Sequence, residues 1–279
     1  MTSRVADQPL MLSIPIDILW LILKHVDRAT LVKMCLLNKV CCSCSQDVLY
    51  RDIRTEPFLD GTRVFPTLVQ STHLARRVRL FEISNHGYGY VNWKKSELRK
   101  SFQNMTGLRI LHIYSHTDLS FLEGCTFDLV SFACGNFYPE PLHRFLHSQP
   151  NLTHVSLGES CGGKPDFDAT CLPNLTRIVT HLSLLPHLIP KRPVKEVIVH
   201  GYKDDANPVD LSFFTLSTTP IQKLAIGDLY FYPNPIQLLA SIFPSITHLK
   251  LDRCASDDKY KGTVRERPFL FISYLTGLS

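Results

Sequence analysis

The sequence predicts a mixed α/β fold in which a small helical module precedes a solenoid of strand–helix repeats. Apolar residues at helical spacing near the N-terminus predict the module, and a six-residue apolar string that recurs eight times predicts the solenoid. We therefore divide the 279 residues into a flexible N-terminal segment (1–11), a helical module (12–53) and the solenoid (54–279).

The helical module is predicted from an apolar stripe over residues 14–26. Its members occur at i, i+4, i+5, i+8, i+9 and i+12, which places them on one helix face. A second stripe over residues 31–44 and a short apolar stretch over 48–50 predict two more helices, with the first break at 27–30. Because about forty residues bury too little apolar surface to be stable alone, we expect the module to pack against another part of the chain.

Each string of the solenoid is apolar at its first, fourth and sixth positions. Of these 24 positions 23 are apolar, and the exception is Thr180. The starts lie 19 to 30 residues apart, with helix-like stretches such as 140–147, 211–216 and 235–243 between them. A short strand followed by a helix at this spacing is typical of a leucine-rich-repeat solenoid, in which stacked units bury each other's apolar faces. The strings begin at Val78, Leu108, Leu129, Leu152, Leu175, Val194, Ile221 and Ile246.

Composition and cysteine content exclude several classes of protein. With 44% hydrophobic and 10% aromatic residues the chain is not disordered, and a net charge of +5 is too small to predict nucleic-acid binding. Nine cysteines, an odd number, argue against a secreted disulfide scaffold. Because the sequence also shows no signal peptide and no apolar run of membrane-spanning length, we expect an intracellular protein, cytoplasmic or nuclear, without membrane contact.

Residues 14–53 resemble an F-box. The segment opens with the pair Ile14-Pro15, continues through a helix rich in leucine and isoleucine, and closes with Leu49-Tyr50-Arg51. An F-box followed by irregular leucine-rich repeats is similar to the F-box/leucine-rich-repeat family, which is common in fungi and plants. The resemblance implies a protein without enzymatic activity or cofactor, acting as the substrate-recognition subunit of a Skp–cullin–F-box ubiquitin ligase.

The resemblance also implies which side chains contact a Skp-type adaptor. Leu19 lies toward the edge of the apolar stripe, so we expect it to face the partner. Ile18 and Ile22 have two candidate environments, the core of the module and the partner. The implied adaptor-binding residues are Ile14, Pro15, Ile18, Leu19, Ile22, Leu31, Leu37 and Leu49.

Residues that alternate with the apolar positions of the strings, or follow directly after them, point to the opposite face of the sheet. This face has two interpretations: a polar surface exposed to water, and a surface that docks an unknown target protein, as concave solenoid faces often do. Many of its members are histidine, lysine or arginine. The candidate target-binding residues are His112, His154, Arg177, His181, His200, Lys223, His248 and Lys250.

Two further functions are alternatives to ligase association. The first is a leucine-rich-repeat scaffold that binds a protein partner without a ligase. The second is a hydrolase, because residues 158–162 match the G-x-S-x-G pattern around a nucleophilic Ser160. Residues 162–165 (Gly-Gly-Lys-Pro) are a poor helix start, whereas that chemistry needs a turn running into a helix, so we predict no catalytic residue.

Cysteine and asparagine motifs receive structural interpretations. The cysteines at 35, 41, 42 and 44 contain one C-x-x-C pair and no second pair, so we predict no metal site. Three Asn-x-Thr sequences begin at Asn104, Asn151 and Asn174, and the last two belong to the repeat string itself. We expect them to be unmodified parts of the solenoid.

The proposed register of the strings is testable by substitution. Val155 should point into the core and His248 should point outward, because strand side chains alternate between faces. Val155→Asp should therefore unfold or strongly destabilise the protein by burying an unpaired charge. His248→Ala should change the free energy of unfolding by no more than about 0.5 kcal/mol. Equal losses of melting temperature in the two variants would contradict this register.

Overall fold

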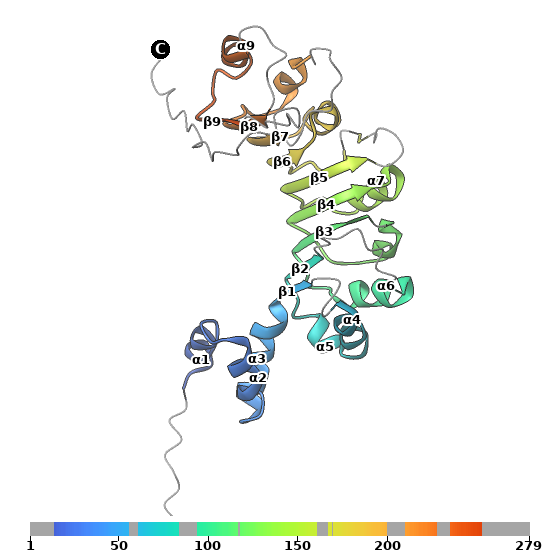
Figure 1. Ribbon diagram of the computed structural model, residues 1–279, viewed down its shortest axis with the longest axis vertical. Helices are drawn as coiled ribbons and strands as arrows, with labels where there is room; N and C mark the ends of the chain where they lie inside the picture. Colours follow the sequence, from blue (N-terminus) through green and yellow to red (C-terminus); the bar gives the residue numbers. More distant parts are fainter. Residues whose placement is uncertain are drawn as a thin grey trace, which may run out of the picture.

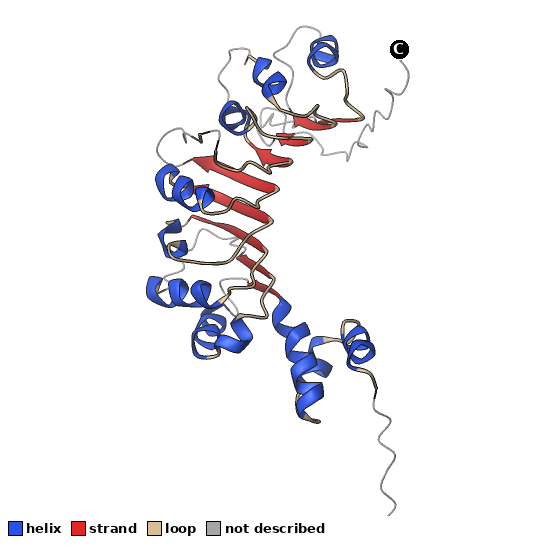
Figure 2. Ribbon diagram, turned by 180° about the vertical axis from the view of Figure 1, so that it is seen from behind, coloured by secondary structure: helices blue, strands red, loops and turns tan. Residues whose placement is uncertain are grey.

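The computed structural model describes residues 14–55, 61–83, 94–116, 118–160, 167–168, 170–199, 210–227 and 235–252. The described strands form a nine-stranded, wholly parallel sheet in which strand order follows the chain (Figure 1). Helices pack along one side of this sheet and leave its other face without a described helix (Figure 2). The predicted α/β class and the repeating strand–helix order are confirmed.

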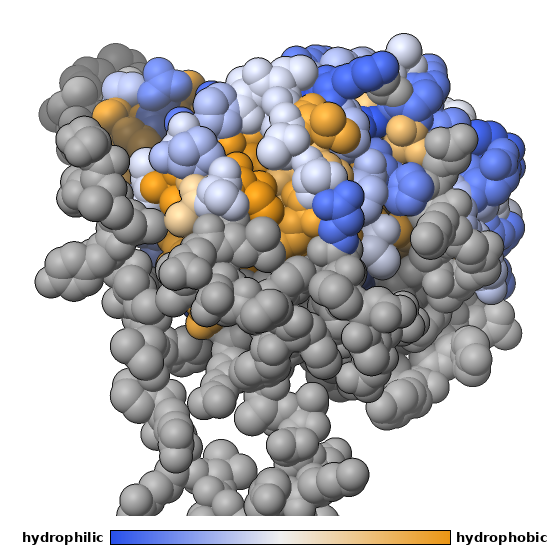
Figure 3. Space-filling model, turned by 90° about the horizontal axis from the view of Figure 1, so that it is seen from above, coloured by the Kyte–Doolittle hydropathy of each residue, from blue (hydrophilic) through white to orange (hydrophobic). Residues whose placement is uncertain are grey.

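The strands coincide with the predicted strings. Of the 24 string positions, all are buried except Leu249 and Leu251, which are partly buried against the same core. In the view onto the β9 end of the molecule, hydrophobic residues lie near the centre of the visible surface, between more polar residues (Figure 3). The strands are β1 (Asp52–Thr55), β2 (Leu80–Ile83), β3 (Ile110–His116), β4 (Ser131–Phe137), β5 (His154–Ser160), β6 (Arg177–Thr180), β7 (Glu196–Val199), β8 (Lys223–Gly227) and β9 (His248–Asp252).

Strand β1 is a ninth copy of the string that the sequence pattern did not reveal. Tyr50, Ile53 and Thr55 occupy its first, fourth and sixth positions, and all three are buried or packed against the solenoid core. The polar sixth position, like that of Thr180, obscured the pattern. Because β1 pairs with β2 from Asp52 onward, the strand crosses the boundary predicted between residues 53 and 54.

The solenoid helices are short and unequal, so the repeats are irregular. The predicted stretch 140–147 lies within α7, 211–216 contains a 3-10 helix, and 235–243 contains α9. Aromatic rings connect successive units, with Phe81 and Phe102 5.3 Å apart and Phe102 and Phe121 also 5.3 Å apart between centroids. These helices are α4 (Gly61–Gln70), α5 (Thr72–Ala75), α6 (Lys95–Asn104), η1 (Leu119–Leu122), α7 (Pro139–His147), η2 (Leu182–Leu184), α8 (Leu185–Leu188), η3 (Ser212–Leu216) and α9 (Pro235–Ile242).

The helical module consists of α1 (Ile16–Leu23), α2 (Arg28–Met34) and α3 (Lys39–Arg51). Both breaks differ from the prediction. The first falls at residues 24–27, because Asp27 caps α2 and residues 28–30 belong to that helix. The second falls at residues 35–38, where the Asn38 side chain accepts a hydrogen bond from the Cys41 backbone N–H (2.8 Å) and caps α3. Residues 48–50 consequently belong to α3 and form no separate helix.

The module is joined to the solenoid covalently and by an arginine. Helix α3 passes directly into β1, and Arg77, which follows α5, donates hydrogen bonds to the Ser43 carbonyl (2.8 Å) and hydroxyl (3.2 Å). Arg77 also forms an ion pair with Asp47. These contacts agree with the expectation that so small a module packs against another part of the chain.

The Asn-Leu-Thr sequences join neighbouring coils. The Thr153 hydroxyl donates to the Val130 carbonyl (3.1 Å), and the Thr176 hydroxyl donates to the Thr153 carbonyl (3.1 Å). The Asn174 amide donates to the Pro150 carbonyl (3.1 Å). The motif therefore supplies side-chain hydrogen bonds parallel to the backbone ladder of the sheet.

A buried arginine organises the turn before β7. Arg192 is 1% exposed, and its guanidinium donates to the backbone carbonyls of Cys171 (2.8 Å), Asp168 (2.6 Å), His187 (3.1 Å) and Pro190 (3.2 Å). Burial lowers the pKa of Arg192 from its usual value. Carbonyl dipoles replace the lost hydration of the cation and tie the loop before β6 to the end of α8.

Arg192→Met should destabilise the solenoid, because it keeps an unbranched stem but leaves these carbonyls without their donor. We expect a loss of about 3 kcal/mol in the free energy of unfolding. The matched control is Arg144→Met on the exposed side of α7, which should cost no more than about 0.5 kcal/mol. Chemical denaturation of both variants measures the difference, and similar stabilities would contradict the structural role of Arg192.

Candidate functional site

The first candidate site is an apolar surface on the helical module. Nine large aliphatic side chains of residues 14–40 are exposed, whereas the module core contains four buried residues, Leu19, Leu23, Leu31 and Cys44. Elsewhere in the described chain four large hydrophobic side chains are exposed, and they are scattered. We call the nine residues the module surface; they are Ile14, Ile16, Ile18, Leu21, Ile22, Val32, Leu36, Leu37 and Val40.

The structure divides the predicted adaptor-binding residues into two groups. Ile14, Pro15, Ile18, Ile22 and Leu37 are exposed. The remaining three are not: Leu31 is buried, Leu49 packs against the module core, and Leu19 is 8% exposed.

The prediction that Leu19 faces a partner is therefore wrong, and Ile18 and Ile22, for which two environments were open, are exposed. The apolar stripe of α1 is wide enough to serve two environments. One side of it, which includes Leu19 and Leu23, packs on α2 and α3, and the other side, which includes Ile18 and Ile22, faces outward. The sequence pattern missed Ile16, Leu21, Val32, Leu36 and Val40, although their apolar character was visible.

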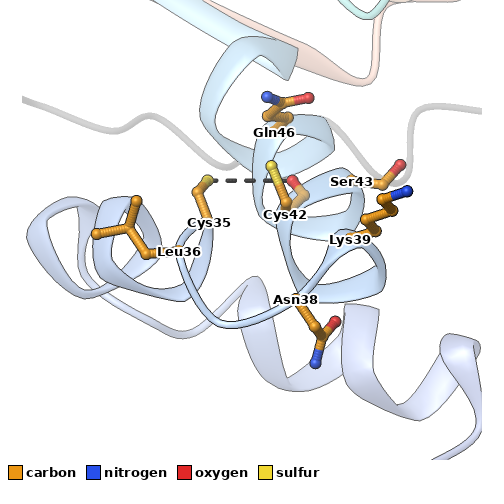
Figure 4. Close-up of a pocket in the computed structure, with 7 residues that line it drawn as sticks. All are labelled: Cys35, Leu36, Asn38, Lys39, Cys42, Ser43 and Gln46. Atoms are coloured by element: carbon orange, nitrogen blue, oxygen red, sulfur yellow. Dashed lines mark hydrogen bonds between the residues drawn. The ribbon is translucent and has the colours of Figure 1, made fainter.

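A hollow of about 350 Å³ lies where α2 ends and α3 begins (Figure 4). Leu36 beside it is 84% exposed, the largest value among the exposed large hydrophobic residues described. Cys35 and Cys42 also line the hollow, and the Cys35 thiol lies 4.0 Å from the Cys42 carbonyl. Burial raises the pKa of the Cys35 thiol, so the sulfur stays protonated and uncharged at neutral pH.

The second candidate site is the sheet face that the helices leave uncovered. Strand pairing places His154, Arg177, Glu196, Lys223 and His248 side by side on successive strands, and we call this line the basic row. His112 and Lys250 lie on the same face, two positions further along their strands. His181 directly follows β6, and His200 lies outside the described residues.

Acidic side chains partly neutralise this face. The Glu196 carboxylate lies 3.2 Å from Arg177 Nε and 4.0 Å from Lys223 Nζ. In the same way, the Glu82 carboxylate lies 3.7 Å from Arg54 Nε and 3.8 Å from His112 Nδ1. Each carboxylate thus lies between two basic side chains on the flanking strands, an arrangement that sequence alternation could not predict.

The hydroxyl of the preceding threonine orients two histidines. The Thr153 hydroxyl lies 3.1 Å from the Val130 carbonyl and 2.7 Å from His154 Nδ1, so it holds the imidazole ring beside the sheet backbone. Thr247 makes the same pair of contacts, with His248 Nδ1 at 2.9 Å.

Ser160 lies in an extended strand. It is the last residue of β5 and pairs with Phe137 of β4. The nearby Gly158 has a packing explanation, because an added Cβ would lie 1.7 Å from the Gly135 carbonyl oxygen. Residues 161–166, which the nucleophile turn would require, lie outside the described residues.

Within the described chain, no helix has the length and apolarity needed to cross a membrane.

The histidines of the uncovered face should make stability depend on pH. Burial, with a smaller contribution from Arg177, lowers the pKa of His154, and burial, opposed by Glu82, lowers the pKa of His112. The unfolded chain, in which histidine has a pKa of about 6.5, therefore binds more protons than the folded chain below that pH. The melting temperature should fall as the pH drops through about 6.5 toward 5, and the double change of His112 and His154 to Gln should reduce this fall. An unaltered pH profile in that variant would contradict the assignment.

Comparisons with known proteins give little beyond this geometry. No protein-family model matches the chain, and no curated protein sequence matches it significantly. Among solved structures, an internalin from Listeria monocytogenes is similar, with 13% sequence identity and a TM-score of 0.32. The match covers 75% of this chain and 63% of that one, less than two thirds of its length. At so low a TM-score the likeness carries no argument, and the repeat architecture stands on the strand order and burial described above.

Proposed function

We propose that the protein is a non-catalytic substrate-recognition subunit of a Skp–cullin–F-box ubiquitin ligase. The helical module would bind a Skp-type adaptor, and the uncovered face of the sheet would bind the target protein. The observation that carries the proposal is the module surface: a three-helix module exposes nine large aliphatic side chains and buries only four core residues.

An apolar surface of this kind favours a protein partner. Each aliphatic side chain left in water forgoes roughly 25 cal/mol per Å² of burial, and contiguous exposed apolar patches commonly mark interaction sites. The nine side chains of the module surface come from residues 14–22, from α2, from the turn after α2 and from the start of α3. The resemblance of residues 14–53 to an F-box supplies the class of partner, a Skp-type adaptor.

The junction between module and solenoid supports the second half of the proposal. Helix α3 continues into β1, and Arg77 ties the helix to the solenoid beside it. A target held on the sheet face would therefore keep a defined orientation relative to the adaptor. Such positioning is what a recognition subunit contributes, because it requires no chemistry of its own.

Co-purification with a Skp-type adaptor tests the adaptor contact. Ile22 is 50% exposed, so Ile22→Asp should leave the module folded while placing a charge in the interface. We expect adaptor affinity to fall by about 100-fold or more, as for a central interface residue. The matched control is Leu216→Asp in η3, where the wild-type side chain is 55% exposed and lies far along the chain from the module.

Three outcomes of this experiment are informative. Loss of the adaptor in Ile22→Asp and retention in Leu216→Asp would support the proposal. Failure of the wild-type protein to bind any Skp-type adaptor would contradict it and favour a repeat scaffold without a ligase. Equal binding by folded Ile22→Asp and wild type would show that the module surface is not the adaptor site. Leu19→Asp is unsuitable, because Leu19 belongs to the module core.

A further inference from the structure

We propose that the sheet face over β5–β9 binds an extended acidic peptide segment with alternating aliphatic residues. The inference rests on the proposed function, since it names the chemical class of the target segment. Two parallel lines of side chains carry it. One is the basic row, and the other is the apolar row, which we define as Val179, Ile198 and Ala225.

The basic row has an excess of positive charge. Arg177 and Lys223 flank a single carboxylate, Glu196, so one cation in the row lacks a full counter-charge within it. His154 and His248 lie at the two ends of the row. Protonation of either would add positive charge. Carboxylates of a bound peptide would therefore meet a complementary field along this line.

The apolar row lies two residues further along β6, β7 and β8, and the same line continues as Ser156 on β5 and Lys250 on β9. Strand register pairs Val179 with Ile198 and Ile198 with Ala225, and all three side chains are half-buried. Aliphatic side chains beside the basic row fit a peptide better than a nucleic acid, because single-stranded nucleic acids rely on aromatic side chains for base stacking.

The spacing of the two rows suits an extended chain lying across the strands. Five strands about 4.8 Å apart span roughly 19 Å, which six residues of an extended peptide cover at about 3.3 Å each. Side chains of such a peptide alternate in direction, so acidic ones can face the basic row while aliphatic ones face the apolar row. Acidic residues about 7 Å apart lie within reach of the flexible Arg177 and Lys223 side chains, which are two strands apart.

Fluorescence anisotropy with the full-length protein tests the proposal. The probe is a labelled peptide of about eight residues with alternating Glu and Val, and the comparison peptide replaces Glu by Gln. We expect the Glu peptide to bind at least about tenfold more tightly at low salt, with affinity falling as salt rises.

Variants locate the contact. Lys223→Glu should weaken binding of the Glu peptide about tenfold or more, and Ile198→Asp should also weaken it. The matched control is Lys100→Glu, which changes the net charge by the same amount. Because Lys100 is exposed on α6, on the helical side of the sheet, the affinity of this variant for the Glu peptide should stay within about twofold of wild type.

Several results would overturn the proposal. These are equal affinity for the Glu and Gln peptides, equal loss in Lys223→Glu and Lys100→Glu, and tighter binding of an oligonucleotide of similar length. Measuring both adaptor co-purification and peptide binding separates the two proposals, and Lys223→Glu should keep the adaptor. If the wild-type protein binds the adaptor but not the Glu peptide, the peptide site alone is refuted. If the wild-type protein binds the Glu peptide but no adaptor, the ligase role alone is refuted.

Discussion

Parallel pairing between successive coils is the interaction on which the rest of the structure depends. Each strand from β2 to β8 hydrogen-bonds to the strand before and the strand after it, and its apolar positions are covered by the equivalent positions of those neighbours. One coil could not bury its own string, so stability is shared between adjacent coils. Two threonine hydroxyls add side-chain hydrogen bonds between coils, because Thr153 and Thr176 each donate to a backbone carbonyl of the preceding coil.

The register that buries the strings also builds the opposite face. Once Val155 pairs with Ile178, His154 must lie beside Arg177, and the next steps bring Glu196 and Lys223 into the same line. The strand register that buries the apolar positions therefore also brings the residues of the basic row together and allows the ion pairs between neighbouring coils. For this reason a surface for recognition can change by substitution of outward residues while the core positions stay as they are.

The helical module depends on the solenoid for a different reason. Its core of four buried residues is too small to stabilise it alone, and it leaves more large aliphatic side chains exposed than it buries. The continuous passage of α3 into β1 and the Arg77 contacts compensate by attaching it to a larger body. An apolar surface held on a small module in this way is available to a partner without contributing to the fold.

Much of the solenoid was predictable from sequence, because alternation along a strand depends only on local backbone geometry. The strings at Val78 to Ile246 located eight strands and separated inward from outward residues before any contact was known. Tertiary structure alone decided which half of the α1 stripe is covered, so that Leu19 is buried and Ile18 exposed. It also decided that Tyr50 begins a ninth string and that Arg192 is enclosed by carbonyls. Periodicity gives the direction of a side chain from its own backbone, but what lies in that direction is determined by other elements of the fold.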